Sequence, residues 1–200
     1  MTQALSSRPK RASALPPEER RAMIVEATLP LLLEYGEAVT TRQIADAAGI
    51  AEGTIFRAFT DKDEVIAAVL EKALDTTALE EALSRIKLDR PFEKCLDEAV
   101  AAIQRRVVDI WQLMSAVGPR FHPQKKSEPT PISPALTRLF EAHKDRLGVK
   151  PAEAAKFLRA LTMSVTHPML NDNPMSSRDV VKLFLYGVHA RPDGRKPGAC

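Results

Sequence analysis

The amino-acid sequence predicts an all-α fold, in which a compact N-terminal domain of three helices precedes a larger helical domain. The composition favours helices, because Ala, Leu, Glu, Arg and Lys recur throughout and aromatic residues make up only 5% of the chain. Apolar residues repeat at helical spacing, and caps and stops divide residues 40–62 into short segments. With 200 residues, 44% of them hydrophobic, the chain can bury a substantial core.

The first helices are marked by their ends. One helix is predicted to begin at Pro17, where proline fits the first turn because its missing N–H would have no partner, and to end at Gly36. Thr40 and Gln43 have the spacing of a capping box, which predicts the start of a short helix. Gly49 is expected to end that helix, since glycine adopts a left-handed backbone without strain.

The later elements follow from apolar spacing. A second short helix is expected over residues 51–59, and the pair Thr60 and Asp63 predicts the cap of a longer helix after it. One long helix or two abutting helices are predicted over 92–118, and the proline-rich stretch 119–134 is expected to be a loop. Three further helices are predicted at 134–147, 151–167 and 177–189.

Charge is concentrated near the N-terminus. The whole chain has a formal charge of +3, and residues 1–21 alone carry five basic and two acidic side chains. Residues 1–16 are rich in Ser, Pro and Ala without an apolar period, so we expect a flexible basic arm. Such an arm either contacts phosphates or the minor groove of DNA, or only aids solubility. Residues 191–200 are expected to be a disordered tail.

Several classes of protein are excluded by what the sequence lacks. Cys95 and Cys200 are too few and too distant for a disulfide framework or a zinc site, and His122 and His143 have no second pair at ligand spacing, so we expect no metal and no cofactor. No catalytic spacing is present, which argues against an enzyme. Without a signal sequence or a long apolar run, we expect a cytoplasmic protein that makes no membrane contact.

The run from Thr40 to Lys62 fits a helix-turn-helix, a motif that needs two short helices at a fixed steep angle. Ala45 and Ala48 supply small inward residues, and Gly49 supplies the turn. The run reads Thr41-Arg42-x-Ile44-Ala45-x-x-Ala48-Gly49-Ile50-x-x-Gly53-Thr54-Ile55-Phe56-x-x-Phe59-x-x-Lys62. In this pattern the chain closely resembles the tetracycline-repressor (TetR) family of bacterial regulators.

The resemblance implies how the chain is organised and what it binds. Members of that family are homodimers with an N-terminal DNA-binding domain and a C-terminal ligand and dimer domain, and most are repressors. We therefore expect a DNA-binding domain over 17–62 and an effector-binding and dimerisation domain over 63–190. The expected partners are a palindromic double-stranded DNA operator, a second copy of the chain and a small-molecule effector. The residues expected at the DNA are Thr41, Arg42, Glu52, Gly53, Thr54, Phe56, Arg57 and Lys62.

Three of these residues carry most of the expected binding. Arg42 and Arg57 are the best candidates for reading guanine, because a guanidinium can donate to O6 and N7 together, although either residue could instead clamp a phosphate. Lys62 lies at the start of a helix, where its charge and the free N–H groups can hold a phosphate.

The chain departs from the family at two positions in the second short helix. Family members often have Ser or Thr at Ala51 and Tyr at Phe56, so a phosphate hydrogen bond is lost at each position while apolar contact with a thymine methyl remains. Glu52 suits a helix N-terminus but repels phosphates unless it accepts from a cytosine amino group or points away.

The C-terminal helices carry the remaining predictions. Their apolar faces are broad, which favours a four-helix interface between two chains over a thick monomeric core. The residues expected there are Leu158, Leu161, Val165, Val181, Phe184, Leu185 and Val188. The residues expected to line a ligand pocket are Trp111, Met114, Phe121, Phe140, His143 and Met163. The alternative functions are a helical adaptor that binds protein, and a DNA-binding regulator without an effector.

Overall fold

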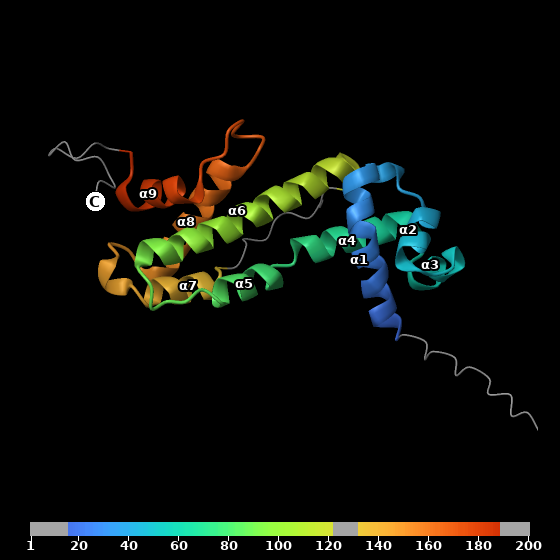
Figure 1. Ribbon diagram of the computed structural model, residues 1–200, viewed down its shortest axis with the longest axis horizontal. Coiled ribbons are helices and arrows are strands. Elements are labelled where there is room, and N and C mark those ends of the chain that lie inside the picture. The colour runs from blue at the N-terminus through green and yellow to red at the C-terminus, as the bar shows by residue number, and fades with distance from the viewer. Residues whose placement is uncertain (1–15, 122–131, 189–200) are drawn as a thin grey trace, which may run out of the picture. The chain divides into compact units, whose positions relative to one another are not determined.

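The computed structural model describes residues 16–121 and 132–188, and every regular element in these ranges is helical (Figure 1). This confirms the predicted fold class. The chain divides into two compact units, Met1–Val69 and Leu70–Cys200. The predicted arm lies outside the described residues except for its last residue, and the predicted tail lies wholly outside them.

Unit 1 is built from short helices around a small apolar core. Its elements are α1 (Pro17–Tyr35), the 3-10 turn η1 (Gly36–Ala38), α2 (Thr41–Ala48), α3 (Glu52–Ala58) and most of α4 (Lys62–Leu74). Helix α1 packs against α2 and α3, and these two pack against each other. Ile24, Leu32, Ile44, Ile55 and Ile66 are fully buried between the helices. This core holds the pair α2 and α3 from the inside.

Two predicted helix ends are confirmed in detail. Thr40 forms the capping box at the start of α2: its hydroxyl accepts from the N–H of Gln43 at 3.2 Å, and the Gln43 side chain accepts from the N–H of Thr40 at 2.9 Å. Gly49 ends α2 with φ of 65°, in the left-handed region. The turn between α2 and α3 therefore has the geometry that its residues predict.

The predicted capping pair at the start of α4 is wrong, because each member lies one residue later in the chain than expected. The carboxylate of Asp61 accepts from the N–H of Glu64 at 2.8 Å, in place of the expected pair Thr60 and Asp63. The Glu64 side chain in turn accepts from the N–H of Thr60 at 2.6 Å. Aspartate caps a helix as well as threonine does, so the residue types alone do not decide between Thr60 with Asp63 and Asp61 with Glu64.

Unit 2 is a bundle of longer helices (Figure 1). Its elements after α4 are α5 (Thr77–Ser84), α6 (Phe92–Val117), η2 (Pro119–Phe121), α7 (Pro134–Glu141), η3 (Lys144–Arg146), α8 (Pro151–Thr166) and α9 (Ser177–Tyr186). Helix α6 packs against α5, α8 and α9, while α7 packs against α5 and α8. The segment 92–118 is thus one long helix, and α5 is a helix that the sequence pattern did not predict. In the described part of the chain, no helix has the length and apolar character to cross a membrane.

Candidate nucleic-acid interface

Helices α2 and α3 present one set of side chains inward and another outward. Ile44, Ala45 and Ile55 are buried on the inner side, and Phe59 closes the core directly after α3. Because these apolar residues and the left-handed turn fix both helices, the outward residues are held on a preformed surface. The residues predicted at the DNA that are exposed are Arg42, Glu52, Gly53, Phe56 and Arg57, and those that are half-buried are Thr41, Thr54 and Lys62.

The most prominent apolar side chain on this surface is Phe56, which is 53% exposed. A large apolar side chain is rarely left in water without a partner, although single exposed ones occur on any protein. Arg57, the next residue along α3, is also exposed, and Arg42 is exposed on α2. The outward surface therefore combines two guanidinium groups with one aromatic ring.

Thr41 and Glu52 lie close together, although eleven residues separate them in the chain. The hydroxyl of Thr41 donates a hydrogen bond to Oε1 of Glu52 and so links the first residue of α2 to the first residue of α3. The carboxylate of Glu52 is directed toward the start of α2, where the helix dipole favours negative charge. The hydroxyl is neutral, so Glu52 keeps the negative charge that the sequence pattern led us to expect to repel phosphates.

Lys62 has a protein partner that the sequence did not reveal. Its ammonium donates to the carbonyl oxygen of Glu37 in the turn η1 at 2.6 Å. An ammonium group has three donors, so this bond leaves capacity for a phosphate but ties the side chain to the end of α1. Lys62 thus joins α4 to η1.

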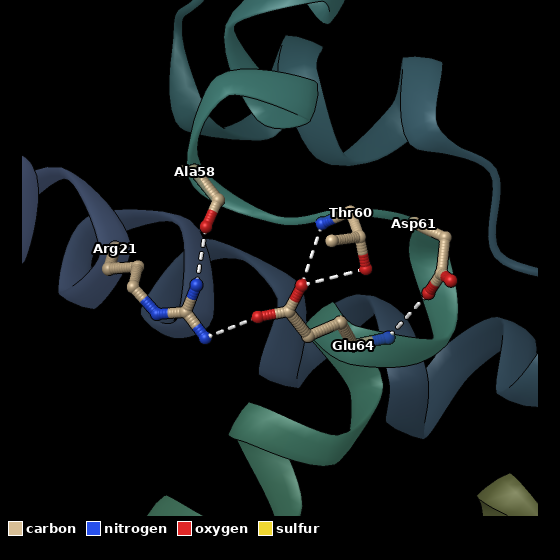
Figure 2. Close-up of polar contacts among 5 residues, drawn as sticks. All are labelled: Arg21, Ala58, Thr60, Asp61 and Glu64. Carbon is tan, nitrogen blue, oxygen red and sulfur yellow. Dashed lines mark hydrogen bonds and ion pairs between the residues drawn. The ribbon is translucent and has the colours of Figure 1, made fainter.

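A cluster around Glu64 was also missed by the sequence pattern (Figure 2). Arg21 of α1 donates to Oε1 of Glu64 at 2.8 Å, and Thr60 donates to Oε2 through both its N–H and its hydroxyl. The N–H of Thr60 and then Arg21 lower the pKa of Glu64 to about 2. The spacing from Asp61 to Glu64 is a capping signal in the sequence, but nothing there points to Arg21.

The residues predicted to line a ligand pocket do not form one group. Phe140 and His143 pack on Phe92 at the start of α6, with ring centroids 5.9 Å and 4.7 Å from it. Trp111 and Met114 lie near the other end of the same helix, where 19 residues beyond Phe92 correspond to about 28 Å of helix. These four residues thus lie at two places along α6, and a single pocket lined by all six stays a prediction. Of the other two members, Phe121 lies in η2 beyond the end of α6, and Met163 is exposed on α8.

The residues predicted at a dimer interface differ in exposure. Leu158 and Val181 are buried in the core of unit 2 by residues of the same chain, which corrects their assignment to a surface. Leu161, Val165, Phe184 and Leu185 are half-buried against that core, and Val188 is 92% exposed. Phe157, which is 57% exposed on α8, was missed because it falls outside the apolar stripe that the spacing selects.

Comparisons with known proteins agree with this geometry. Residues 24–69 match the sequence model of the bacterial regulatory proteins of the tetR family. Over 78 residues the chain is 37% identical to the HTH-type transcriptional regulator HbdR of Aromatoleum sp. (strain CIB), an alignment that covers 38% of this chain and 34% of HbdR. The matched part of the chain thus spans about a third of the length of that relative.

Solved structures extend the likeness to most of the chain. A TetR-family transcriptional regulator of Mesorhizobium loti MAFF303099 has a TM-score of 0.56 at 18% identity, with 86% of this chain and 97% of that chain covered. A regulator of the TetR/AcrR family from Thermobifida fusca YX-ER1 has a TM-score of 0.55 at 20% identity, with 86% and 99% covered. At these identities the structures show a shared fold. Residues 24–69 are thus similar to the tetR family of bacterial regulatory proteins, and the chain as a whole shares the fold of these TetR-family structures.

Proposed function

We propose that the protein is a sequence-specific DNA-binding transcriptional regulator that reads the major groove with α3. The observation that carries this proposal is the exposure of Arg42 and Arg57 on two short helices whose inner faces are locked in a core. A helix-turn-helix places its second helix in the major groove, where a guanidinium can recognise guanine through O6 and N7.

Gly53 supports this proposal independently. Apart from its chain neighbours and the backbone of its own helix, a Cβ on Gly53 would meet no atom within 4 Å, and α3 is helical there, so the packing against other elements does not require glycine. Glycine makes a helix less stable than alanine does, so its presence in the first turn of α3 needs an explanation other than the stability of the helix. Close approach of the DNA backbone to α3 supplies one.

The other outward residues complete the proposed contacts. Phe56 offers apolar contact to a thymine methyl, and we expect Lys62 and Thr54 to bind phosphates. Thr41 and Glu52 act together, because the hydroxyl of one is bound to the carboxylate of the other. A cytosine amino group can donate to the other carboxylate oxygen of Glu52, Oε2, while Thr41 holds Oε1.

The test is binding to duplex DNA taken from upstream of the chain's own gene and its neighbours, measured by fluorescence anisotropy at several salt concentrations. We expect affinity to fall steeply as salt rises, and R42A or R57A to weaken binding roughly 5- to 150-fold if each reads a base. R105A, which removes an exposed arginine from α6, is the matched control and should bind normally. Absent or salt-insensitive DNA binding would favour the helical adaptor instead.

We also propose that the protein works as a homodimer through the outer face of α8 together with α9. On α8, Phe157 and Met163 are 57% and 46% exposed, and the exposed small residue Ala160 lies between them at helical spacing. Two helices from each of two chains would cover this face as a four-helix interface. A two-fold dimer suits a palindromic operator, whose half-sites lie about 34 Å or a multiple apart.

The dimer is tested by sedimentation equilibrium of the wild type and F157D. A charge at Phe157 would be buried without a partner in the interface, so we expect the variant to dissociate to monomers at micromolar concentration. V149D places the same charge at an exposed apolar residue outside α8 and α9, and should leave the dimer intact. A monomeric wild type would contradict the proposal.

Repression and its release by a small molecule complete the proposed function, and both rest on the similarity to the tetR family. The protein would act in the cytoplasm, where it meets the operator. Compounds chosen from the chemistry of neighbouring gene products can be titrated into the protein bound to DNA. Loss of operator affinity at saturation would support an effector, and unchanged affinity throughout would favour a regulator without one.

A further inference from the structure

Arg21 joins three helices at the end of the proposed recognition helix (Figure 2). One guanidinium nitrogen, Nη1, donates to the carbonyl oxygen of Ala58, the last residue of α3. The other, Nη2, donates to Glu64 of α4 at 2.8 Å. The guanidinium carbon also lies 4.0 Å from the ring centroid of Phe59. A side chain of α1 therefore touches the end of α3, the following residue and the start of α4.

Glu64 fixes the other side of this connection. Its second carboxylate oxygen accepts from the N–H of Thr60 at 2.6 Å and from the Thr60 hydroxyl at 2.9 Å. Its own N–H donates to Asp61 at 2.8 Å. Both Thr60 and Asp61, in the short link between α3 and α4, are thereby hydrogen-bonded to Glu64. We call Arg21, Ala58 O, Thr60, Asp61 and Glu64 the α3–α4 clasp.

The clasp supplies what α3 cannot supply alone. A helix of seven residues is not stable by itself, and its last carbonyl groups have no partners within the helix. Arg21 donates a hydrogen bond to one of these carbonyl groups, that of Ala58, and its planar guanidinium also binds the carboxylate of Glu64. The position of the C-terminal end of α3 thus depends on a side chain from another element.

We propose that Arg21 is a positioning residue for DNA recognition, which holds the C-terminal end of α3 against α1 and α4 and does not itself contact DNA. The inference rests on the proposed function. If Arg21 has this role, Arg57, one residue before Ala58, reaches its base or phosphate only when the hydrogen bonds of the clasp are formed. A preformed contact surface binds more tightly because no ordering cost is met on binding.

The competing role is a direct phosphate contact by Arg21. The two roles differ in their salt dependence, because each phosphate contact contributes about 0.9 to the slope of log K against log salt concentration. A positioning residue leaves that slope unchanged when it is replaced. General destabilisation is a third possibility, and it lowers the fraction of active protein equally for every DNA-contact variant.

The experiment uses the full chain and a duplex enriched by that chain from a random pool. Affinities are measured over a salt series for the wild type, R21M, R57A and the double variant, well below the melting temperature. For R21M we expect binding weaker by roughly tenfold with an unchanged salt slope. We further expect R57A to cost less in the R21M background than in the wild type, because Arg57 is already misplaced there.

The controls separate the possible failures. R21K keeps the charge but loses the fork, so its affinity should lie between those of R21M and the wild type. R85M breaks an exposed ion pair with Glu81 in unit 2, 3.1 Å long, and should not alter DNA binding. A wild-type affinity for R21M, a shallower salt slope or additive effects of R21M and R57A would each overturn the inference while the proposed function stands. If the wild type enriches no duplex, the proposed function itself fails, and the inference with it.

Discussion

The two units are held together by different means. In unit 1, polar side chains at defined positions fix short helices: Thr40 caps α2, Asp61 caps α4, and Arg21 with Glu64 ties α1 to the end of α3. In unit 2, helices of 8 to 26 residues surround a larger apolar core, in which the rings of Phe92, Phe140 and Phe184 follow one another at centroid distances of 5.9 Å. Serine side chains cap two of these helices, α7 and α9.

The difference matches what each unit is proposed to do. A hydrogen bond has a narrow range of length and angle, so polar links fix the relative positions of small elements. A surface that must fit the grooves of DNA needs such positions. Apolar cores tolerate substitution as long as volume and pattern are kept, so the same bundle can serve different ligands and interfaces. Substitutions in the two units should therefore have different consequences.

The largest effect is expected from F140A in unit 2. Phe140 is fully buried, and removing its ring should destabilise this unit by about 3–5 kcal/mol, through lost burial and the cavity left behind. The fluorescence of Trp111, the single tryptophan, reports on unit 2 during denaturant unfolding, while circular dichroism reports on the helices of both units. We expect the fluorescence transition to move to lower denaturant and a helical fraction to persist beyond it. M169A, at an exposed residue, is the control. Coincident transitions would show that the two units unfold together.

A matched pair of glycines in unit 1 should give the next largest effect. Gly49 has φ of +65°, so G49A forces alanine into the left-handed region and should cost about 1–2 kcal/mol. Gly53 is helical and has space for a Cβ, so G53A should stabilise the protein by up to about 1 kcal/mol and still weaken DNA binding. Thermal unfolding and DNA anisotropy of the two variants test this. Normal DNA binding by G53A would remove the support that Gly53 gives to the proposed function.

The accuracy of the sequence predictions depends in both units on how local each signal is. The start of α1 and both ends of α2 were predictable because Pro17, Thr40, Gln43 and Gly49 act on backbone groups within four residues of themselves. The starts of α7, α8 and α9 were predicted as well, at residues 134, 151 and 177. Helix α5 was missed because it has neither a capping side chain at its start nor a clear apolar stripe. The side chain of Thr76, at its start, makes no cap hydrogen bond, and Leu83 is its one buried residue.

Contacts between distant residues could not be predicted from spacing. Arg21 and Glu64 lie 43 residues apart, and many other acidic residues were equally available to Arg21 in the sequence. Likewise, spacing puts Phe140 and Trp111 on apolar helix faces but does not say that Phe140 packs on Phe92, at the other end of α6 from Trp111. Thr28 is fully buried in α1 because its hydroxyl donates to the carbonyl of Ile24 at 2.7 Å, a solution that apolar patterning overlooks.

A smaller effect is expected from the helix caps, and it differs between α2 and α5. T40A removes a side-chain oxygen that accepts the N–H of Gln43, so it should destabilise unit 1 by about 1 kcal/mol. T76A is the matched change in unit 2, where the threonine makes no cap hydrogen bond, and its effect should be close to zero. Thermal melts of both variants measure the contrast. Equal losses for T40A and T76A would mean that the capping box adds nothing specific to unit 1.

The smallest effect is the pH dependence that Glu64 gives to unit 1. The N–H of Thr60 and then Arg21 on α1 stabilise its charged form, and they hold its pKa at about 2 against an ordinary value of 4.5. A carboxylate with a lowered pKa in the folded protein contributes its full stability above the ordinary value and loses it as the pH falls toward the lowered one. The difference in melting temperature between the wild type and E64Q should therefore be constant above about pH 5 and shrink between pH 4.5 and 2. Other carboxylates titrate in both proteins and cancel in this difference. A difference that stays constant down to pH 2 would mean that the clasp does not depend on the charge of Glu64, and that the carbonyl of Ala58 and the ring of Phe59 hold Arg21 without it.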